Sequence, residues 1–380
     1  MGFFYSGGGE RTVLNEALEF QRRGHNVKVF GAVVDRQRCF PELINRVHVR
    51  AFFWDVNWPL VRKSGNMIVQ SMVAPFLKKR LGKFDWVIAH AQLAPWIAYN
   101  TSKQYLCYMQ QPSRFLYPRP IDEGSWRYDA DMQFLSTVVP KVPWIKTLDK
   151  MSVRGAKGVF ANAAWVSHWV QDVYGVPVTP CPLGVDRSVF RPLPDKRKAR
   201  KTILMVARHV PQKRQDWLVQ MMPQIIKKCG EVTLVLAGGF SSYTRKLSAL
   251  ARELGVSKNV IMREMLGDEL VEAYNRATVF GFTPPTEDFG LAPLEAMACG
   301  IPVVCWNTAG PKETVVDGVT GFKIRPYDLG AFTEKLITLL LDDELNSKIG
   351  RNAVAHVAEN YTWKKHVDIL EATMCEMNQY

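Results

Sequence analysis

Residues 279–299 read VFGFTPPTEDFGLAPLEAMAC, and this stretch decides the fold. The apolar run over 279–283 predicts a buried strand, and the apolar spacing from Pro293 predicts a helix through Cys299. Gly290 stands at the junction, where the strand gives way to the helix. A strand that leads through a glycine loop into a helix is the repeating unit of a parallel α/β sheet.

The same alternation fills the rest of the chain in two series. In the second series we expect further strands at 201–207, 233–237, 259–263, 302–305 and 321–324, with helices at 217–229, 244–254 and 269–276. In the first series we expect strands at 2–5, 27–30, 86–90, 105–109 and 158–161, with a helix over 10–23. The interval 178–194 contains four prolines and marks a domain connection. The fold class is therefore α/β, with two Rossmann-like doubly wound domains that face a cleft.

The predicted domain boundaries follow from this division. Residues 1–190 form an N-terminal domain that binds the acceptor, and residues 191–360 form a C-terminal domain that binds the donor. Residues 361–380 form a C-terminal helix that crosses back to the N-terminal domain.

Composition excludes several classes of protein. No run of 18 apolar residues and no charged-then-apolar leader occurs, so we expect a cytoplasmic protein without a membrane span. The seven cysteines are scattered and form no C-x-x-C pair, which fits a reducing compartment better than a disulfide framework or a zinc site.

The formal net charge of +13 suggests an anionic partner, although a basic soluble surface is the alternative. No nucleic-acid signature accompanies the dispersed Lys and Arg residues, so nucleic acid is the weakest candidate. Peripheral contact with an anionic membrane is a second hypothesis. It depends on Phe52-Phe-Trp54, Trp58 and an amphipathic stretch from Met67 to Leu81, which a core-facing helix explains equally well.

The segment Glu287–Glu295 has the features of a sugar-diphosphate site. Backbone N–H groups of Phe289, Gly290 and Leu291 at a helix N-terminus would bind an anion. Glu295 is placed to accept hydrogen bonds from ribose hydroxyls, and Glu287 from hydroxyls of the attached sugar. These carboxylates are compatible with a diphosphate only if cations elsewhere neutralise it.

Two cations follow the predicted strand 201–207. Arg208 offers a fork of donors to phosphate oxygens, and Lys213 adds a point charge. Their place at a strand's carboxyl end favours a binding role over a merely solvated basic loop.

These residues belong to an ordered series of motifs that covers nearly the whole chain. In chain order the motifs are Gly7-Gly8-Gly9-Glu10-Arg11, Arg23-Gly24-His25, Pro182-Leu-Gly-Val-Asp186 with Phe190, Ala207-Arg208 to Lys213, Ala237-Gly238-Gly239, Glu287 to Glu295, Ala296-Met-Ala-Cys-Gly300-Ile-Pro302-Val, Gly310-Pro311-Lys-Glu313 and Gly318-Val-Thr-Gly321-Phe322. The series resembles the retaining glycosyltransferase family 4, which has the GT-B fold. It is most similar to Alg2-like mannosyltransferases acting on polyprenyl-linked sugars and to bacterial mannosyltransferases of the lipopolysaccharide type.

The resemblance implies a role for each matching position. Arg208, Lys213 and Glu287 would be catalytic, with the two cations offsetting charge on the departing nucleotide. The donor would be bound by Gly8, Gly9, Arg263, Met265, Asp288, Phe289, Gly290, Leu291 and Glu295, with the base near 263–265. No metal or other cofactor is implied, since no D-x-D pair is placed to hold a metal and the two cations can replace it.

The acceptor side departs from the family. Many relatives have a His where this chain has Gln110 or Gln111, and a Gln cannot carry a proton. His90 at the end of a predicted strand is an alternative sugar contact, and a hydrogen-bonded structural His is the competing interpretation. Arg114 completes the acceptor set, because Gln111-Pro-Ser-Arg-Phe-Leu-Tyr117 is similar to a motif of bacterial mannosyltransferases.

The leading hypothesis is a retaining transferase that moves a hexose, mannose from GDP-mannose, to a glycan or lipid-linked acceptor. A UDP-sugar-dependent transferase is the nearest alternative, because the residues of the base site do not decide between the two. A nucleotide-sugar epimerase and a non-catalytic binding subunit are further alternatives.

Overall fold

The computed structural model describes residues 3, 7–54, 83–90, 94–114, 116–119, 141, 143–194 and 201–378. The chain divides into two compact units. Unit 1 contains Met1–Gly184 and Trp363–Tyr380, and unit 2 contains Val185–Thr362. The boundaries expected from the sequence, after residues 190 and 360, differ from these by a few residues. A proline-rich connection shows that the chain leaves one core, but not the residue at which the next core begins.

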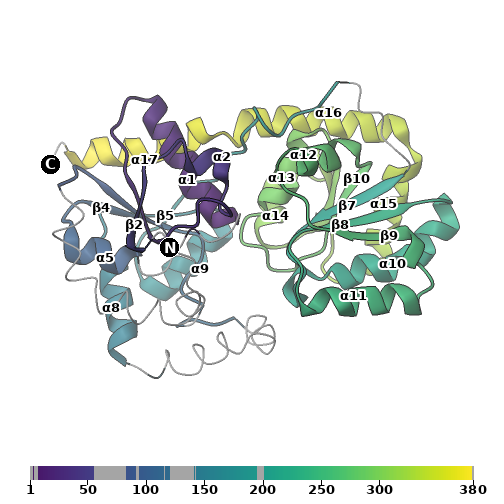
Figure 1. Ribbon diagram of the computed structural model, residues 1–380, viewed down its shortest axis with the longest axis horizontal. Helices are drawn as coiled ribbons and strands as arrows, with labels where there is room; N and C mark the ends of the chain where they lie inside the picture. The colour runs from purple at the N-terminus through teal and green to yellow at the C-terminus, as the bar shows by residue number, and fades with distance from the viewer. Residues whose placement is uncertain are drawn as a thin grey trace. The chain divides into compact units, whose positions relative to one another are not determined.

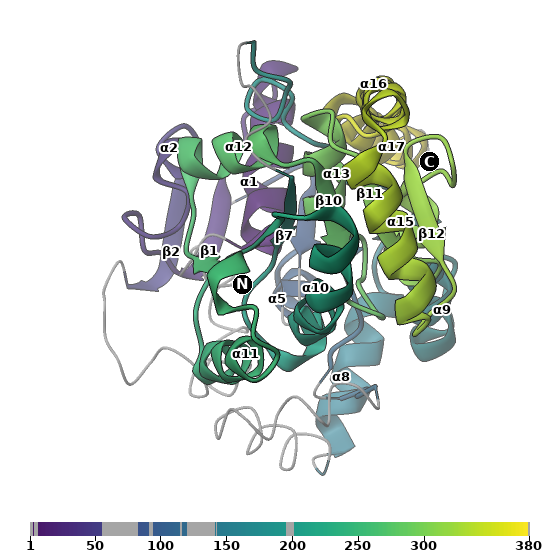
Figure 2. The same cartoon turned by 90° about the vertical axis from the view of Figure 1, so that its right-hand side faces the viewer.

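Unit 2 is built on a six-stranded parallel sheet in the order β12-β11-β10-β7-β8-β9. Figure 2 shows β12, β11, β10 and β7 following one another across this sheet from right to left. All four residues of β10 are buried, as expected for a strand covered by helices on both faces. The strands are β7 (Thr202–Val206), β8 (Thr233–Ala237), β9 (Val260–Arg263), β10 (Val279–Phe282), β11 (Val303–Trp306) and β12 (Gly321–Ile324).

Helices cover both faces of this sheet. Figure 1 shows α10 and α11 below the sheet and α12 and α13 above it. The helices of unit 2 are α10 (Gln215–Cys229), α11 (Ser242–Glu253), α12 (Gly267–Arg276), α13 (Leu291–Ala298), α14 (Ala309–Thr314), α15 (Leu329–Leu341) and α16 (Asp343–Asn360). This two-layered covering of a parallel sheet is the doubly wound architecture predicted from the sequence.

Unit 1 is also α/β with parallel strands. One sheet pairs β1 (Val29–Val33) with β2 (Val49–Trp54), and Phe3 forms an isolated parallel bridge to Val34. A second sheet has the order β3-β4-β5-β6, formed by Val87–His90, Tyr105–Met109, Gly158–Ala161 and Thr179–Pro180. The helices are α1 (Gly8–Arg22), α2 (Pro41–Ile44), α5 (Ala94–Thr101), α8 (Pro143–Arg154), α9 (Ala164–Tyr174) and α17 (Trp363–Asn378).

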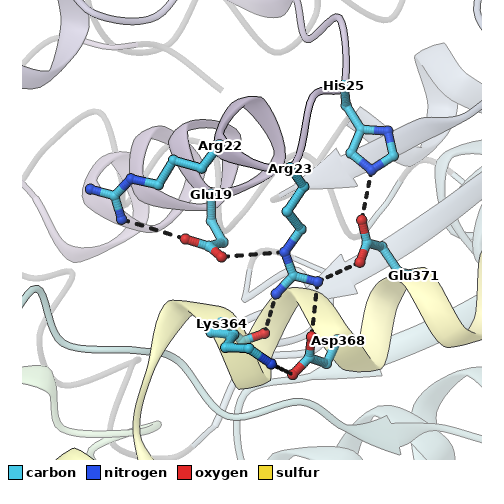
Figure 3. A network of polar contacts seen from close by, with 7 residues as sticks. All are labelled: Glu19, Arg22, Arg23, His25, Lys364, Asp368 and Glu371. Atoms are coloured by element: carbon cyan, nitrogen blue, oxygen red, sulfur yellow. Dashed lines mark hydrogen bonds and ion pairs between the residues drawn. The ribbon is translucent and has the colours of Figure 1, made fainter.

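A polar network fastens α17 to the end of α1 (Figure 3). The guanidinium of Arg23 contacts Glu19 of its own helix at 3.2 Å. It also pairs with Asp368 of α17 at 2.9 Å and with Glu371 of the same helix. His25 Nε2 lies 2.6 Å from the second oxygen of Glu371. The last helix of the chain is therefore held on unit 1 by charges as well as by packing.

The predicted elements are largely present, although many of their ends lie one or two residues from the expected bounds, as in α13, which spans Leu291–Ala298. Of the strand expected at 2–5, only Phe3 lies among the described residues. The first helix begins at Gly8 rather than Glu10, and the next strand lies at 29–33 rather than 27–30. Phe52-Phe-Trp54 closes strand β2, which the sequence analysis did not predict. Trp58 and the stretch 67–81 lie outside the described residues. Among the helices that the structure describes, none combines the length and the apolar character needed to cross a bilayer.

Candidate functional site

The strand order of unit 2 places its binding crevice between β7 and β10. From β7 the chain continues to β8 and β9 on one side, whereas β10 pairs with the other side of β7. In an open parallel sheet, ligands bind outside the carboxyl ends of the strands at such a switch point. The loops after β7 and β10 carry Arg208, Lys213 and Glu287, so these three predicted donor residues follow the carboxyl ends of the two strands.

The centre of the site is an ion pair between these two loops. Nζ of Lys213 lies 2.5 Å from Oε2 of Glu287, and both side chains are partly exposed. The lysine retains two further N–H groups for phosphate oxygens, and the carboxylate has acceptor capacity left for a hydroxyl. The pair therefore presents a cation and an acceptor side by side, as a sugar phosphate requires.

Thr283 fixes the cationic loop at the end of β10. Its Oγ1 lies 2.8 Å from the carbonyl oxygen of Arg214 and 3.2 Å from that of Lys213. The backbone oxygen of Thr283 in turn accepts a 2.8 Å hydrogen bond from the indole of the buried Trp306. Arg214 has a positive φ of 53°, which is uncommon for a residue other than glycine. The hydrogen bonds from Thr283 hold the turn after Lys213 in this conformation. The position of Lys213 thus depends on a threonine that the sequence analysis did not single out.

The acidic loop is positioned by backbone packing. The N–H of Gly310 donates a 2.9 Å hydrogen bond to the carbonyl of Glu287. A Cβ atom at Gly310 would lie 2.5 Å from Cα and O of Phe289, so only glycine permits this approach. Gly290 has φ +92° and forms the N-cap of α13, whose first-turn N–H groups have no carbonyl partner within the helix. The backbone N–H groups of Phe289, Gly290 and Leu291 therefore lie at the start of α13, where the sequence analysis expects an anion site.

Arg208 lies on the other flank of the crevice and is exposed. Gly239 separates Arg208 from Glu264. A Cβ atom added to this glycine would lie 3.8 Å from Cγ of Arg208 and 3.6 Å from Oε1 of Glu264. The backbone N–H of Phe240 donates to this Glu264 oxygen at 2.9 Å. Phe240 itself is exposed and its ring lies 5.3 Å from that of the buried His209. A cation, a glycine, an oriented carboxylate and an aromatic ring thus follow one another along the carboxyl ends of β7, β8 and β9.

The remaining predicted donor residues lie at the same edge. Glu295 is only 5% exposed, and its carboxylate accepts a 2.9 Å hydrogen bond from the hydroxyl of Tyr274. This bond fixes one oxygen of the carboxylate. Arg263 ends β9, is paired with Glu269 at 2.9 Å, and its carbonyl accepts from the N–H of Gly238. Met265 follows it and is half-buried, and Asp288 lies in the loop that leads to α13.

In unit 1 the predicted glycines are in helix rather than in a preceding loop. Gly8 and Gly9 form the first turn of α1, with Gly7 as the extended N-cap residue. Their φ values are not in the left-handed region. The absence of side chains, rather than backbone freedom, is what these positions contribute to a ligand's approach.

His90 ends β3 and is part of a buried charged cluster. Its Nε2–H donates to Oε1 of Glu16 at 2.9 Å, and Nε2 of His366 donates to the other oxygen at 2.8 Å. Nδ1 of His366 donates to the carbonyl of Pro182 at 2.9 Å, and the thiol of Cys181 is 3.4 Å from the same nitrogen. The bond to Glu16 agrees with the interpretation of His90 as a hydrogen-bonded structural residue. Glu16 contacts only Nε2 of the ring and not Nδ1.

The environment of this cluster shifts two pKa values. Burial alone would raise the pKa of the Glu16 carboxyl, but the imidazoles of His90 and His366 lower it to about 2. Burial alone would lower the pKa of His366, but Cys181 and Glu16 raise it to about 10. A carboxylate and an imidazolium thus balance one another in the core of unit 1.

Gln110, Gln111 and Arg114 follow β4 directly and are all partly buried. The buried Oε1 of Gln111 has no hydrogen-bond partner among the residues that the structure describes. Among the residues that the structure describes, no group of three or more His, Cys, Asp or Glu side chains could hold a metal ion.

Comparison with known families covers nearly the whole chain. The model of Glycosyltransferase Family 4 matches residues 6–189, and that of Glycosyl transferases group 1 matches residues 186–356. The chain belongs to glycosyltransferase family 4. Its two Rossmann-like domains are those of the GT-B fold, as the resemblance of its motifs implied.

Similar proteins agree with this assignment. A GDP-mannose-dependent alpha-(1-6)-phosphatidylinositol monomannoside mannosyltransferase of Mycolicibacterium smegmatis is 32% identical over 48% of this chain and 52% of its own length. A D-inositol 3-phosphate glycosyltransferase of Acidothermus cellulolyticus is 32% identical over 57% of this chain and 52% of its own length. The chain spans about half the length of these curated relatives.

A solved structure is similar over its full length. HepE of Anabaena, in complex with UDP and glucose, superposes with a TM-score of 0.75 and 18% sequence identity. The alignment covers 99% of this chain and 98% of that one. At this identity the likeness establishes the fold, and the donor has to be argued from the site.

Proposed function

We propose that this family 4 glycosyltransferase transfers mannose from GDP-mannose, with retention, to a hydroxyl of a glycan or polyprenyl-phosphate-linked saccharide. The observation that carries the proposal is the Lys213–Glu287 pair at the switch point between β7 and β10. Lys213 and Arg208 bind the diphosphate, and Glu287 accepts a hydrogen bond from a hydroxyl of the donor sugar. The named mannosyltransferase among the similar sequences supports the choice of sugar.

The reaction exchanges one bond at the anomeric carbon for another. The bond from this carbon to the diphosphate oxygen breaks, and a bond to the acceptor oxygen forms on the same face. The departing phosphate oxygen takes the acceptor proton, so neither Gln110 nor Gln111 has to carry one. Positive charge at Arg208 and Lys213 stabilises the negative charge that grows on the leaving group, which is usually the largest contribution to such a reaction.

Glu264 supports guanine as the base. Its carboxylate is oriented by the Phe240 N–H at the end of β9, where the base is expected. Guanine presents an N–H and an adjacent NH₂ group, both donors, which suit a carboxylate acceptor. Uracil has a single N–H between two carbonyl oxygens, and those oxygens would be repelled. UDP-sugars therefore remain the second candidate donors, and a donor panel separates the two.

The test is transfer and donor hydrolysis over a panel of GDP- and UDP-sugars, with thermal shift to record nucleotide binding. We expect turnover of GDP-mannose and stabilisation by GDP, because a ligand that binds the native state raises its apparent stability. Turnover of UDP-sugars alone would establish the alternative donor. Binding without turnover of any donor would indicate a binding subunit, and conversion of the sugar without its release would indicate an epimerase.

A substitution identifies the sugar contact within the same assay. Glu287→Ala should abolish transfer while GDP continues to raise the melting temperature. The matched control is Glu334→Ala, which removes a carboxylate from the exposed 2.7 Å pair with Lys228 between α10 and α15. Transfer by Glu287→Ala at the rate of this control would show that Glu287 does not contact the sugar.

A further inference from the structure

A buried amide links the two cationic positions of unit 2. Gln215 is the first residue of α10 and follows Lys213 after one intervening residue, and its side chain is only 1% exposed. Its Nε2–H donates to the carbonyl oxygen of Arg208 at 2.8 Å. One side chain thus contacts the backbone of one cationic residue from the end of the loop that carries the other.

The peptide group that follows Arg208 is held at both of its ends. Its carbonyl oxygen accepts the amide of Gln215 and also the N–H of Val210 at 2.9 Å, so both lone pairs are used. Its N–H, which belongs to His209, donates to the carbonyl oxygen of Gly239 at 2.9 Å. These bonds fix the plane of this peptide, and with it the direction in which the side chain of Arg208 leaves the loop.

Lys213 is placed by a separate anchor. The hydroxyl of Thr283 lies 3.2 Å from the carbonyl oxygen of Lys213 and 2.8 Å from that of Arg214. Gln215 follows this anchored turn directly, so its backbone has a fixed place relative to Lys213. The bond from Gln215 to Arg208 therefore ties the second cation to the position of the first.

Only one orientation of the Gln215 amide satisfies the carbonyl of Arg208. Reversal would place Oε1 against the carbonyl oxygen, and two acceptors repel one another. In the observed orientation Oε1 is buried and has no hydrogen-bond partner among the residues that the structure describes. An unpaired buried acceptor destabilises a protein at least as much as one neutral hydrogen bond stabilises it, so net stability does not explain an amide at this position.

The alternative is a local role in starting helix α10. A capping side chain accepts hydrogen bonds from N–H groups in the first turn of its own helix. The side chain of Gln215 instead donates, and its partner Arg208 lies outside the helix. The residue therefore connects the start of the cationic loop to the helix that follows it and does not cap the helix.

We propose that Gln215 is a positioning residue of the donor site, whose amide sets the place of Arg208 relative to Lys213. It acts through the backbone of Arg208 and does not itself touch the donor. This inference rests on the proposed function, in which Arg208 and Lys213 bind the diphosphate.

Calorimetric titration with GDP tests this role through a double-mutant cycle of Gln215→Met and Arg208→Ala. Methionine has a similar length but has no N–H to donate. We expect Gln215→Met to weaken the Kd for GDP about tenfold, because a displaced guanidinium loses a charge-assisted hydrogen bond. In the double variant we expect no loss beyond that of Arg208→Ala alone, because the positioned side chain is gone. Losses that add, or a wild-type Kd for Gln215→Met, would overturn the proposal.

The matched control in the same helix is Gln224→Met. The amide of Gln224 donates to Glu334 at 3.2 Å on the exposed surface. Loss of this bond should leave the Kd for GDP unchanged. Equal weakening by Gln224→Met would show that any change in α10 disturbs GDP binding, and the specific role of Gln215 would be overturned.

Gln215→Glu restores the hydrogen bond when its carboxyl is protonated. A neutral carboxyl has an O–H donor for the carbonyl of Arg208, and burial favours the neutral form. At about pH 5.5 we therefore expect Gln215→Glu to bind GDP within about threefold of wild type, whereas Gln215→Met stays about tenfold weaker. Equal weakening of the two variants would show that the hydrogen bond of this side chain is not what places Arg208.

Arg208→Ala separates this proposal from the proposed function. If Arg208→Ala weakens GDP binding but Gln215→Met does not, Gln215 is not a positioning residue and the donor site stands. If neither Arg208→Ala nor Lys213→Ala changes the Kd for GDP, the proposed function fails as well.

Discussion

Gly310 offers a direct way to disturb the donor site without touching a charged residue. In the substitution Gly310→Ala, the new Cβ atom would lie 2.5 Å from Cα and O of Phe289 and 2.7 Å from O of Asp288. An ordinary contact of this kind is 3.4–4 Å long. All the obstructing atoms belong to the backbone, so no side chain can turn away. The loop 287–290 or the start of α14 must move.

The size of the effect follows from this distance. Restoring an ordinary contact requires a displacement of about 1 Å, and a misplacement of that size can lower a rate about 10²-fold. Overpacking of a core contact typically costs about 1–3 kcal/mol of unfolding free energy. We therefore expect kcat/KM for transfer to fall about 10²-fold, while the domain remains folded with reduced stability.

The assay is steady-state transfer together with urea denaturation, and Gly330→Ala is the matched control. At Gly330 the nearest atom to a new Cβ is Oδ1 of Asp328 at 3.5 Å, an ordinary contact. Because Gly330 lies in the first turn of α15, alanine there should stabilise the protein by about 0.5–1 kcal/mol and leave transfer unchanged. If Gly310→Ala retained the transfer rate of Gly330→Ala, the loop 287–290 would not be part of the site.

Three further predictions concern the supporting contacts. Glu16→Gln removes one member of a buried charge pair and should lower the unfolding free energy by about 3–5 kcal/mol in urea denaturation. In wild type the lowered pKa of Glu16 makes stability fall as the pH drops from 4.5 towards about 2, and the raised pKa of His366 makes it fall as the pH rises from 6.5 towards about 10. A stability curve that stays flat in both ranges would contradict the charged state of this pair. Thr283→Val keeps the shape of the side chain but loses the hydroxyl that holds the loop of Lys213. We expect kcat/KM to fall about tenfold, which corresponds to the loss of one hydrogen bond of about 1–1.5 kcal/mol. An unchanged kcat/KM would show that this anchor is dispensable. Arg23→Ala should cost on the order of 1 kcal/mol more than Arg22→Ala, because Arg23 is 19% exposed within a network, whereas Arg22 is 61% exposed in a single pair. Equal melting temperatures of these two variants would rule out a stabilising network.

The fold could be predicted from the sequence because most of its strands are short apolar runs that alternate with helical segments. The strands at 105–109, 158–161, 233–237 and 321–324 have the bounds that the sequence indicated. Such runs are typical of strands in a parallel sheet whose two faces are covered by helices. The start of α1 was harder, since Gly8 and Gly9 are poor helix formers and only the tertiary structure holds them in the first turn.

The composition of the donor site could also be predicted, but not its contacts. The sequence identified Lys213 and Glu287 separately, whereas their pairing joins residues 74 positions apart. The support from Thr283 could not be inferred, because a threonine at a strand end has many local explanations. Glu16 and His366 are 350 positions apart, and no periodic pattern links them.

Calorimetric titration with GDP tests the central claim, that Arg208 and Lys213 bind the diphosphate of the donor. Each charged hydrogen bond is worth about 1.5–3 kcal/mol, so the double variant Arg208→Ala/Lys213→Ala should weaken the Kd for GDP about 10²–10⁴-fold. The control is Lys227→Ala/Lys228→Ala, which removes the same formal charge from the last turn of α10. The control should bind GDP as wild type does. A Kd for the Arg208/Lys213 variant equal to that of the control would contradict the account.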